Sequence, residues 1–161
     1  MKKNNKGFSL VEIIVVIAIM AVLMGILIPT LVKNVNKSKR SVDVEGAGEF
    51  AHSIQRVLTA DPDIYYTFVG EEAPNYTFSW NSGTSKDYFK DDPLVGKVLE
   101  DFSNLPVSKW DKSLTWLVNI NGENGDVHIY LVDSLSDTKG YELFPNHDTY
   151  VKKNKKRDIV F

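Results

Sequence analysis

The 161-residue chain contains no cysteine. This absence excludes a disulfide framework and a thiolate metal site, so any globular part must be stabilised by its own hydrophobic core. It does not locate the protein, because a chain without cysteine fits every redox compartment. The length is sufficient for about one domain and a membrane segment. Charged residues make up 25% of the chain, as in an ordinary globular domain.

Charge is nearly absent from residues 8–32, where Glu12 is the only charged side chain. At about 1.5 Å per residue, a helix of this length spans about 37 Å, enough to cross a hydrocarbon core of about 30 Å. The A-x-A-like cleavage site of a secretory signal does not follow the run. We therefore expect residues 8–32 to be a retained transmembrane helix. A carboxylate inside it costs about 2.5–3.5 kcal/mol, which makes Glu12 a candidate functional residue.

Positive charge flanks this apolar run on both sides. Residues 1–7 form a basic leader, and a basic collar follows at Lys33, Lys37, Lys39 and Arg40. Both flanks are similarly basic, so the positive-inside rule does not orient the helix. Without residues 1–7 the chain has 16 basic and 21 acidic side chains, a net charge of −5, which argues against general nucleic-acid binding.

A second, amphipathic helical segment follows the collar. Apolar residues recur there at spacings of three and four, which predicts a helix with one apolar face. They are Ala47, Phe50, Ala51, Ile54, Val57 and Leu58. Asp61-Pro62 predicts the end of the helix. A continuous helix from Phe8 to about Ala60 would be about 80 Å long. Pro29, with Gly25 one turn earlier, predicts a kink or a loosened turn in its first half.

The remaining sequence predicts an antiparallel sheet, and thus an α+β fold class with the long N-terminal helix packed on a C-terminal sheet. Residues 61–112 are interpreted as a long connection with short strands at Ile64–Val69 and Tyr76–Trp80. Residues 113–161 are expected to form the sheet, and turn residues in the Asn121–Gly125 loop predict a hairpin there. The expected strands are Leu114–Ile120, Val127–Val132, one in Tyr141–Phe144 or Thr149–Lys152, and Ile159–Phe161.

Enzymatic signatures are missing from the sequence. It has neither a nucleophile-elbow motif nor a glycine-rich phosphate loop, so we expect no catalytic residue and no cofactor. His52, His128 and His147 lack metal-ligand spacing, which favours structural roles for the first two and no metal site. Four aspartates are interpreted as turn formers rather than calcium ligands, because a loop of alternating oxygens is absent. They are Asp61, Asp63, Asp91 and Asp92. The three tryptophans, Trp80, Trp110 and Trp116, are expected in the core.

The string Lys6-Gly7-Phe8-Ser9-Leu10-Val11-Glu12, followed by an apolar helix, resembles the class III signal of type IV pilins and pseudopilins. The resemblance is close over residues 6–32, and Pro29 matches the usual proline of this helix in the family. It implies that a prepilin peptidase cuts between Gly7 and Phe8 and then N-methylates Phe8. Residues 1–7 would be the leader, 8–32 the transmembrane and filament-core helix, and 33–161 the exported pilin domain, with the helix continuing over 33–60.

The same resemblance implies partners and a location. The partners would be other copies of the chain in a helical filament, an assembly ATPase, a platform membrane protein, minor pilins and, before assembly, membrane lipid. The precursor would be a single-pass protein of the cytoplasmic or inner membrane. The mature chain would be a structural subunit of a surface pilus for adhesion, aggregation or motility. Many pilins of Gram-negative bacteria close a C-terminal loop with a disulfide. Residues 133–161 cannot do so, which favours a Gram-positive-type pilin.

Two alternatives to a pilus subunit remain open at this point. A pseudopilin of a type II secretion or DNA-uptake system carries the same signal and forms short filaments. A membrane-anchored extracellular binding or enzymatic domain would keep an ordinary, uncleaved anchor. The mass of the mature protein distinguishes the last alternative from the other two.

Glu12 acquires a candidate partner from this resemblance, the positive amine that cleavage creates on Phe8. The two groups would lie one turn apart in one helix, or pair between neighbouring copies and fix their axial register. The alternative is that Glu12 lies near the cytoplasmic interface, where a charge costs little. For Gly25 and Pro29, the alternatives are a segment that loosens on packing into the filament and a kink satisfied by neighbouring helices.

A basic cluster near the C-terminus consists of Lys152, Lys153, Lys155, Lys156 and Arg157. We expect either a solvated strand end that protects a sheet edge or a contact patch. Such a patch would bind DNA, an anionic cell-wall polymer or an acidic neighbour in the filament. The acidic helix segment Asp43–Glu49 of another subunit would complement it.

Overall fold

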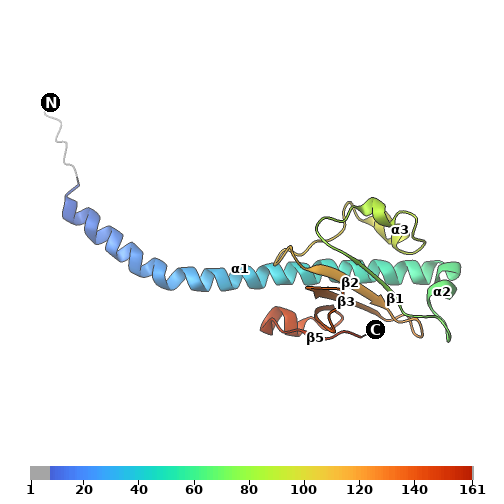
Figure 1. Cartoon of the computed structure of the whole chain (residues 1–161). Coiled ribbons are helices and arrows are strands. Elements are labelled where there is room, and N and C mark those ends of the chain that lie inside the picture. Colours follow the sequence, from blue (N-terminus) through green and yellow to red (C-terminus); the bar gives the residue numbers. More distant parts are fainter. Residues whose placement is uncertain (1–7, 161) are drawn as a thin grey trace, which may run out of the picture. The chain divides into compact units, whose positions relative to one another are not determined.

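The structure is a computed structural model that describes residues 8–160 (Figure 1). The chain divides into two compact units, one ending at Asn36 and one beginning at Lys37. Helix α1 (Leu10–Ala60) runs without interruption from the first unit into the second. The predicted long helix and its end before Asp61-Pro62 are therefore confirmed, with a start two residues later than expected.

The second half of α1 supplies one side of the hydrophobic core. The side chains of Ala47, Phe50, Ala51 and Ile54 are fully buried, and Leu58 is 4% exposed. These are residues of the predicted apolar face. They join one cluster with buried side chains of the sheet, and Figure 1 shows the strands lying along this half of the helix. Every buried side chain among residues 8–160 belongs to the unit that begins at Lys37.

The sheet has five antiparallel strands in the order β1-β2-β3-β4-β5. Their bounds are β1 Tyr76–Trp80, β2 Thr115–Ile120, β3 Val127–Val132, β4 Lys139–Phe144 and β5 Arg157–Asp158. The predicted hairpin is confirmed as β2 and β3, in a register that places Thr115 opposite Val132. The register of β1 and β2 places Trp80 opposite Trp116, and the two rings stack at 5.5 Å. Both tryptophans are buried, as predicted.

One predicted strand is a helix. Residues 64–69 fall mostly within α2 (Pro62–Phe68), so the expectation of a strand at Ile64–Val69 is wrong. The Asp61 carboxylate accepts hydrogen bonds from the backbone N–H groups of Asp63 and Ile64, at 3.1 and 3.2 Å. Pro62 occupies the first turn, where its missing N–H costs nothing. Asp61-Pro62 thus ends one helix and caps the next.

The C-terminal segment also departs from the prediction. Of the two alternatives for the fourth strand, Tyr141–Phe144 is confirmed within β4, whereas Thr149–Lys153 is a short π-helical turn, η3. Asn154 ends this turn in the left-handed conformation, with φ of 49°. The last strand is β5, so the expected strand at Ile159–Phe161 is wrong over its described part, and Phe161 lies outside the described residues.

The connection between α2 and β2 is more structured than its composition suggests. It contains β1, two short 3₁₀ turns and one helical turn: η1 (Lys86–Phe89), α3 (Val95–Val98) and η2 (Leu99–Asp101). Leu94, Val95 and Val98 are fully buried and enter the main core. Their apolar side chains explain how a segment rich in Asp, Asn and Ser holds a fixed position on the domain.

A buried carboxylate fastens α1 to the rest of the domain. Asp43 is 2% exposed. Its Oδ2 accepts hydrogen bonds from Ser108 Oγ at 2.9 Å, Trp110 N at 3.3 Å and Tyr150 Oη at 2.8 Å. Its Oδ1 accepts one from Lys109 N at 2.5 Å. One side chain of the helix therefore holds both the loop before β2 and the turn η3.

Candidate processing and assembly site

The candidate processing site lies at the start of the described residues. Phe8 is 85% exposed, and Gly7, on the other side of the expected scissile bond, lies outside the described residues. Helix α1 begins two residues after Phe8. The helix that would follow cleavage thus begins close to the expected cut.

Glu12 lies in the first turn of α1 and turns back toward its start. Its Oε2 accepts a hydrogen bond from the backbone N–H of Ser9 at 2.8 Å. A helix start has four N–H groups without helical acceptors and a partial positive charge, so a carboxylate there is favourable. Ser9-x-x-Glu12 also has the spacing of a capping box. This spacing is visible in the sequence, yet the sequence interpretation considered only the Phe8 amine as a partner for Glu12, beside a location near the cytoplasmic interface.

The first half of α1 presents apolar side chains on all sides. Among residues 8–36, none is buried within the unit. By length and composition this helix could cross a membrane. An exposed apolar surface of this extent marks a site of contact with lipid or protein. Its large apolar side chains, each at least 44% exposed, include Ile13, Ile17, Met20, Val22, Leu23, Met24, Ile26, Leu27, Leu31 and Val35.

Pro29 and Gly25 are coupled through one missing hydrogen bond. In an α-helix the N–H of residue 29 would donate to the carbonyl of residue 25, and proline has no N–H. Helical structure nevertheless continues through Pro29. The neighbouring Thr30 hydroxyl donates to the Ile26 carbonyl at 3.5 Å, and Gly25 has open space where a Cβ would lie. This turn is thus held by fewer main-chain bonds than its neighbours.

The C-terminal basic cluster is largely paired within the chain. Arg157 Nη1 donates to Glu142 Oε2 at 2.9 Å, and Glu142 is 4% exposed. Lys156 pairs with Asp133, whose carboxylate raises the pKa of Lys156. Lys152 pairs with Asp148 at 3.1 Å. Lys155 is exposed, and the side chain of Lys153 lies outside the described part of the structure.

These pairs bear on the expected contact with an acidic neighbour. Three of the five cationic side chains already have an intramolecular carboxylate partner. In the acidic helix segment, Asp43 is buried and bonded within the domain, whereas Glu45 and Glu49 are exposed. Among the side chains that the structure describes, an intersubunit contact of this kind would therefore rest on Lys155 and these two glutamates.

The histidines and aspartates make local contacts. His52 Nδ1 lies 3.3 Å from Gln55 Oε1, and His128 Nδ1 lies 3.5 Å from Glu142 Oε1. Asp92 accepts hydrogen bonds from the N–H groups of Leu94 and Val95 at 3.0 and 2.8 Å. Asp61 and Asp92 both cap helical turns, as the interpretation as turn formers predicts. Across residues 8–160, no group of three or more candidate metal ligands occurs.

Comparison with known protein families identifies a motif at the start of the chain. The model of the prokaryotic N-terminal methylation motif matches residues 2–28, which include Gly7, Phe8 and Glu12. Neither the curated proteins nor the solved structures gave a match. The motif implies processing by a prepilin peptidase and self-assembly, points to a structural protein, and with the apolar helix supports a membrane-anchored precursor. Residues 2–28 thus carry the class III signal of type IV pilins, and together with the pilin-like α+β arrangement this signal supports a type IV pilin-like or pseudopilin protein.

Proposed function

We propose that this chain is a structural subunit of a type IV pilus, which polymerises through the first half of α1 into a surface filament. The observation that carries the proposal is an apolar helix half that nothing in its own unit covers, with one carboxylate in its first turn. Such a helix satisfies its backbone hydrogen bonds internally in lipid, and packing against other copies of the same apolar helix also keeps its side chains out of water. The proposed roles are adhesion, aggregation or motility of the cell.

The proposal assigns a role to each segment. Residues 1–7 are the leader that prepilin peptidase removes, and residues 8–32 are first a membrane anchor and then the filament core. Residues 33–161 are the exported domain. An assembly ATPase and a platform membrane protein would move subunits from the membrane into the filament, together with minor pilins. The proposed final location is the cell surface.

Glu12 would supply the specificity of assembly. Removal of residues 1–7 creates a positive amine on Phe8, and the carboxylate of a neighbouring Glu12 would neutralise it in the apolar filament core. An unpaired charge left in such surroundings costs about 3–5 kcal/mol, so only the register that pairs the two groups is stable. In the precursor the same carboxylate caps its own helix through Ser9 N–H. Assembly would therefore exchange a local contact for an intersubunit one.

Intact mass spectrometry of the protein purified from its host membrane tests the processing step. The proposal predicts a chain that begins at Phe8 and carries one added methyl group. A Gly7→Leu variant, as a control, should keep the full precursor mass, because a side chain at that position blocks close approach of the protease. A wild-type protein that retains Met1, or starts elsewhere, would favour the anchored-domain alternative.

Substitution of Glu12 tests the assembly step and separates charge from capping. Glu12→Val should insert into the membrane normally but form few or no filaments. Glu12→Gln keeps an acceptor for Ser9 N–H, so it should cap the helix yet fail to assemble, because it cannot neutralise the Phe8 amine. Glu45→Gln, which removes an exposed charge from the second half of α1, is the matched control and should assemble. Normal filament yield from Glu12→Gln would overturn the charge-pairing role.

A further inference from the structure

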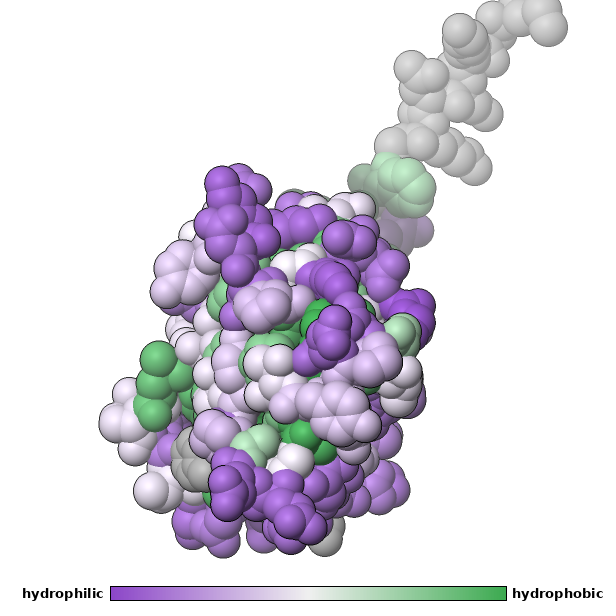
Figure 2. Space-filling view, turned by 90° about the vertical axis from the view of Figure 1, so that its right-hand side faces the viewer, coloured by the Kyte–Doolittle hydropathy of each residue, from purple (hydrophilic) through white to green (hydrophobic). Residues whose placement is uncertain are grey.

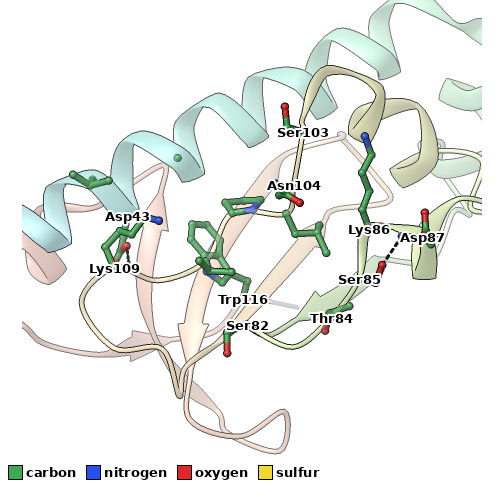
Figure 3. A pocket seen from close by; sticks show the side chains of 15 residues that line it. Asp43, Ser82, Thr84, Ser85, Lys86, Asp87, Ser103, Asn104, Lys109 and Trp116 are labelled. Carbon is green, nitrogen blue, oxygen red and sulfur yellow. Dashed lines mark hydrogen bonds between the residues drawn. The ribbon is translucent and has the colours of Figure 1, made fainter.

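A groove with both polar and apolar lining residues lies between the second half of α1 and the two loops that precede and follow the helical turns of the connection. It has a volume of about 730 Å³, within the usual range of about 300–1,000 Å³ for small-molecule sites. Figure 3 shows Trp116 in the middle of this site, with Lys109 near α1 and Asp87 at the opposite end. The polar side chains that line it are Asp43, Ser82, Thr84, Ser85, Lys86, Asp87, Ser103, Asn104 and Lys109.

Trp116 in this groove has an unpaired donor. The residue is 1% exposed, and its indole Nε1 has no acceptor among residues 8–160. By contrast, Nε1 of the stacked Trp80 donates to the Pro106 carbonyl at 2.6 Å. About nine in ten buried polar groups have a partner, and an unpaired one lowers stability. A ligand oxygen, reached by a small shift of the lining, would supply the missing acceptor.

The charges of the groove balance. Its lining includes two lysines, Lys86 and Lys109, and two aspartates, Asp43 and Asp87. Asp43 is occupied by its four bonds, and Lys86 Nζ donates to the Phe102 carbonyl at 2.6 Å. The groups left to meet a ligand are one cation, one anion, hydroxyls and an amide. Such a lining favours an uncharged ligand with many hydroxyl groups over a phosphate, a metal ion or a basic peptide.

A second groove continues the first on the far side of the loop around residue 84. Its volume is about 650 Å³, and Thr84, Ser85 and Asp87 line both grooves. It presents Tyr88, which is 78% exposed, and Leu135, which is 58% exposed. A sugar ring has polar edges and apolar C–H faces, and an exposed tyrosine ring matches such a face while its hydroxyl stays in water.

We propose that these two grooves form a binding site for a neutral oligosaccharide. The loop around residue 84 would contribute hydroxyls to both halves, Asp87 and Asn104 would hold sugar hydroxyls, and Tyr88 would stack on a neighbouring ring. This site is separate from the assembly helix, and it gives the exported domain a ligand chemistry of its own. It does not depend on filament formation, so the two proposals stand or fall on different experiments.

The test is a titration of the full-length mature chain in dodecylphosphocholine micelles, because detergents with sugar head groups would compete. The probes are lactose, maltose, cellobiose and N,N′-diacetylchitobiose. The readout is the indole N–H resonance of each tryptophan, assigned with Trp116→Phe and Trp110→Phe. We expect at least one probe to shift the Trp116 resonance saturably, with a millimolar midpoint, while Trp110, which contacts Tyr141 and Tyr150 instead, does not move.

Exposed side chains at the rim provide variants that leave the core intact. Asp87→Asn and Asn104→Ala should each raise the midpoint about fivefold, the effect of one lost hydrogen bond. Asp63→Asn and Asn146→Ala are the matched controls, because these residues are also exposed but lie outside both grooves. The proposal is overturned if no probe moves the Trp116 resonance, if Trp110 shifts equally, or if rim and control variants bind alike.

Discussion

Replacement of Asp43 tests how the long helix is fastened to its domain. Its two carboxylate oxygens receive four hydrogen bonds, from Ser108, Lys109, Trp110 and Tyr150. Asp43→Ala removes all four acceptor contacts at once and leaves two backbone N–H groups without their partner. Asp43→Asn keeps the shape of the side chain and one of its two oxygens. Its amide NH₂ group is a donor and would face the backbone N–H of Trp110, which is also a donor, so the hydrogen bond between these two residues is lost.

The expected magnitudes follow from these contacts. Loss of a buried, fully bonded carboxylate in Asp43→Ala should lower the free energy of unfolding by about 3–5 kcal/mol. Asp43→Asn should cost about 1.5–3 kcal/mol, because a subset of the charge-assisted bonds is lost. Tyr150→Phe removes a single donor and should cost about 1 kcal/mol. Since domains have about 5–15 kcal/mol of stability in total, the alanine variant should be near the limit of folding.

Urea unfolding of residues 37–161, followed by tryptophan fluorescence, measures these differences. This fragment contains every buried side chain among the described residues. In a double-mutant cycle, Asp43→Ala with Tyr150→Phe should show a coupling of about 1 kcal/mol. An exposed control, Glu49→Ala, should change stability by less than about 0.5 kcal/mol. A loss below about 1 kcal/mol in Asp43→Ala would refute the argument that this residue fastens the helix.

Three further predictions concern pH, a glycine and the proline. Burial, with Asp43 nearby, holds the pKa of Tyr150 above its usual range. The stability this gives is present below the unfolded pKa of about 10 and is lost as pH rises, so stability should fall by about 1.4 kcal/mol per pH unit above that point. Tyr150→Phe should reduce this slope in urea titrations, and an unchanged slope would contradict the assignment. Gly122→Ala should destabilise the domain by about 3 kcal/mol, because the added Cβ would overlap the Ala73 carbonyl. Gly48→Ala should instead stabilise the domain in the same urea assay, because this helical glycine has open space where the Cβ would lie. Equal effects of the two alanines would contradict this. Pro29→Ala restores an N–H for the Gly25 carbonyl and should slow amide hydrogen exchange in that turn in micelles, while unchanged exchange would show that the turn is already rigid.

The elements predictable from sequence were those with local signals. The apolar run, the Asp61-Pro62 stop and the hairpin around Asn121–Gly125 all have causes within a few residues of each other. The α2 helix had such a signal too. Asp61 followed by Pro62 is a favourable helix start as well as a stop, and the aromatic and β-branched residues after it favoured a strand instead. The same holds for Glu12: a charge within an apolar run predicts a role in assembly, whereas the Ser9-x-x-Glu12 spacing also predicts a capping box.

Other features depend on residues far apart in the chain. The hydrogen bond between Asp43 and Tyr150 joins residues separated by 107 positions, and no periodic pattern in the sequence predicts it. Pairing of Arg157 with Glu142 and of Lys156 with Asp133 likewise requires the sheet to be folded first. For that reason the C-terminal cluster resembled a free basic patch in the sequence. The groove around Trp116 is assembled from α1 and two loops, and no motif marks it.

The central claim is that this chain forms the body of a filament. Electron microscopy of cells that carry the gene, with gold-labelled antibody against residues 37–161, tests it most directly. The account predicts surface filaments labelled along their whole length, which disappear when the gene is deleted and do not return with Glu12→Val. Label confined to filament tips, or filaments that persist unlabelled in the deletion strain, would contradict it.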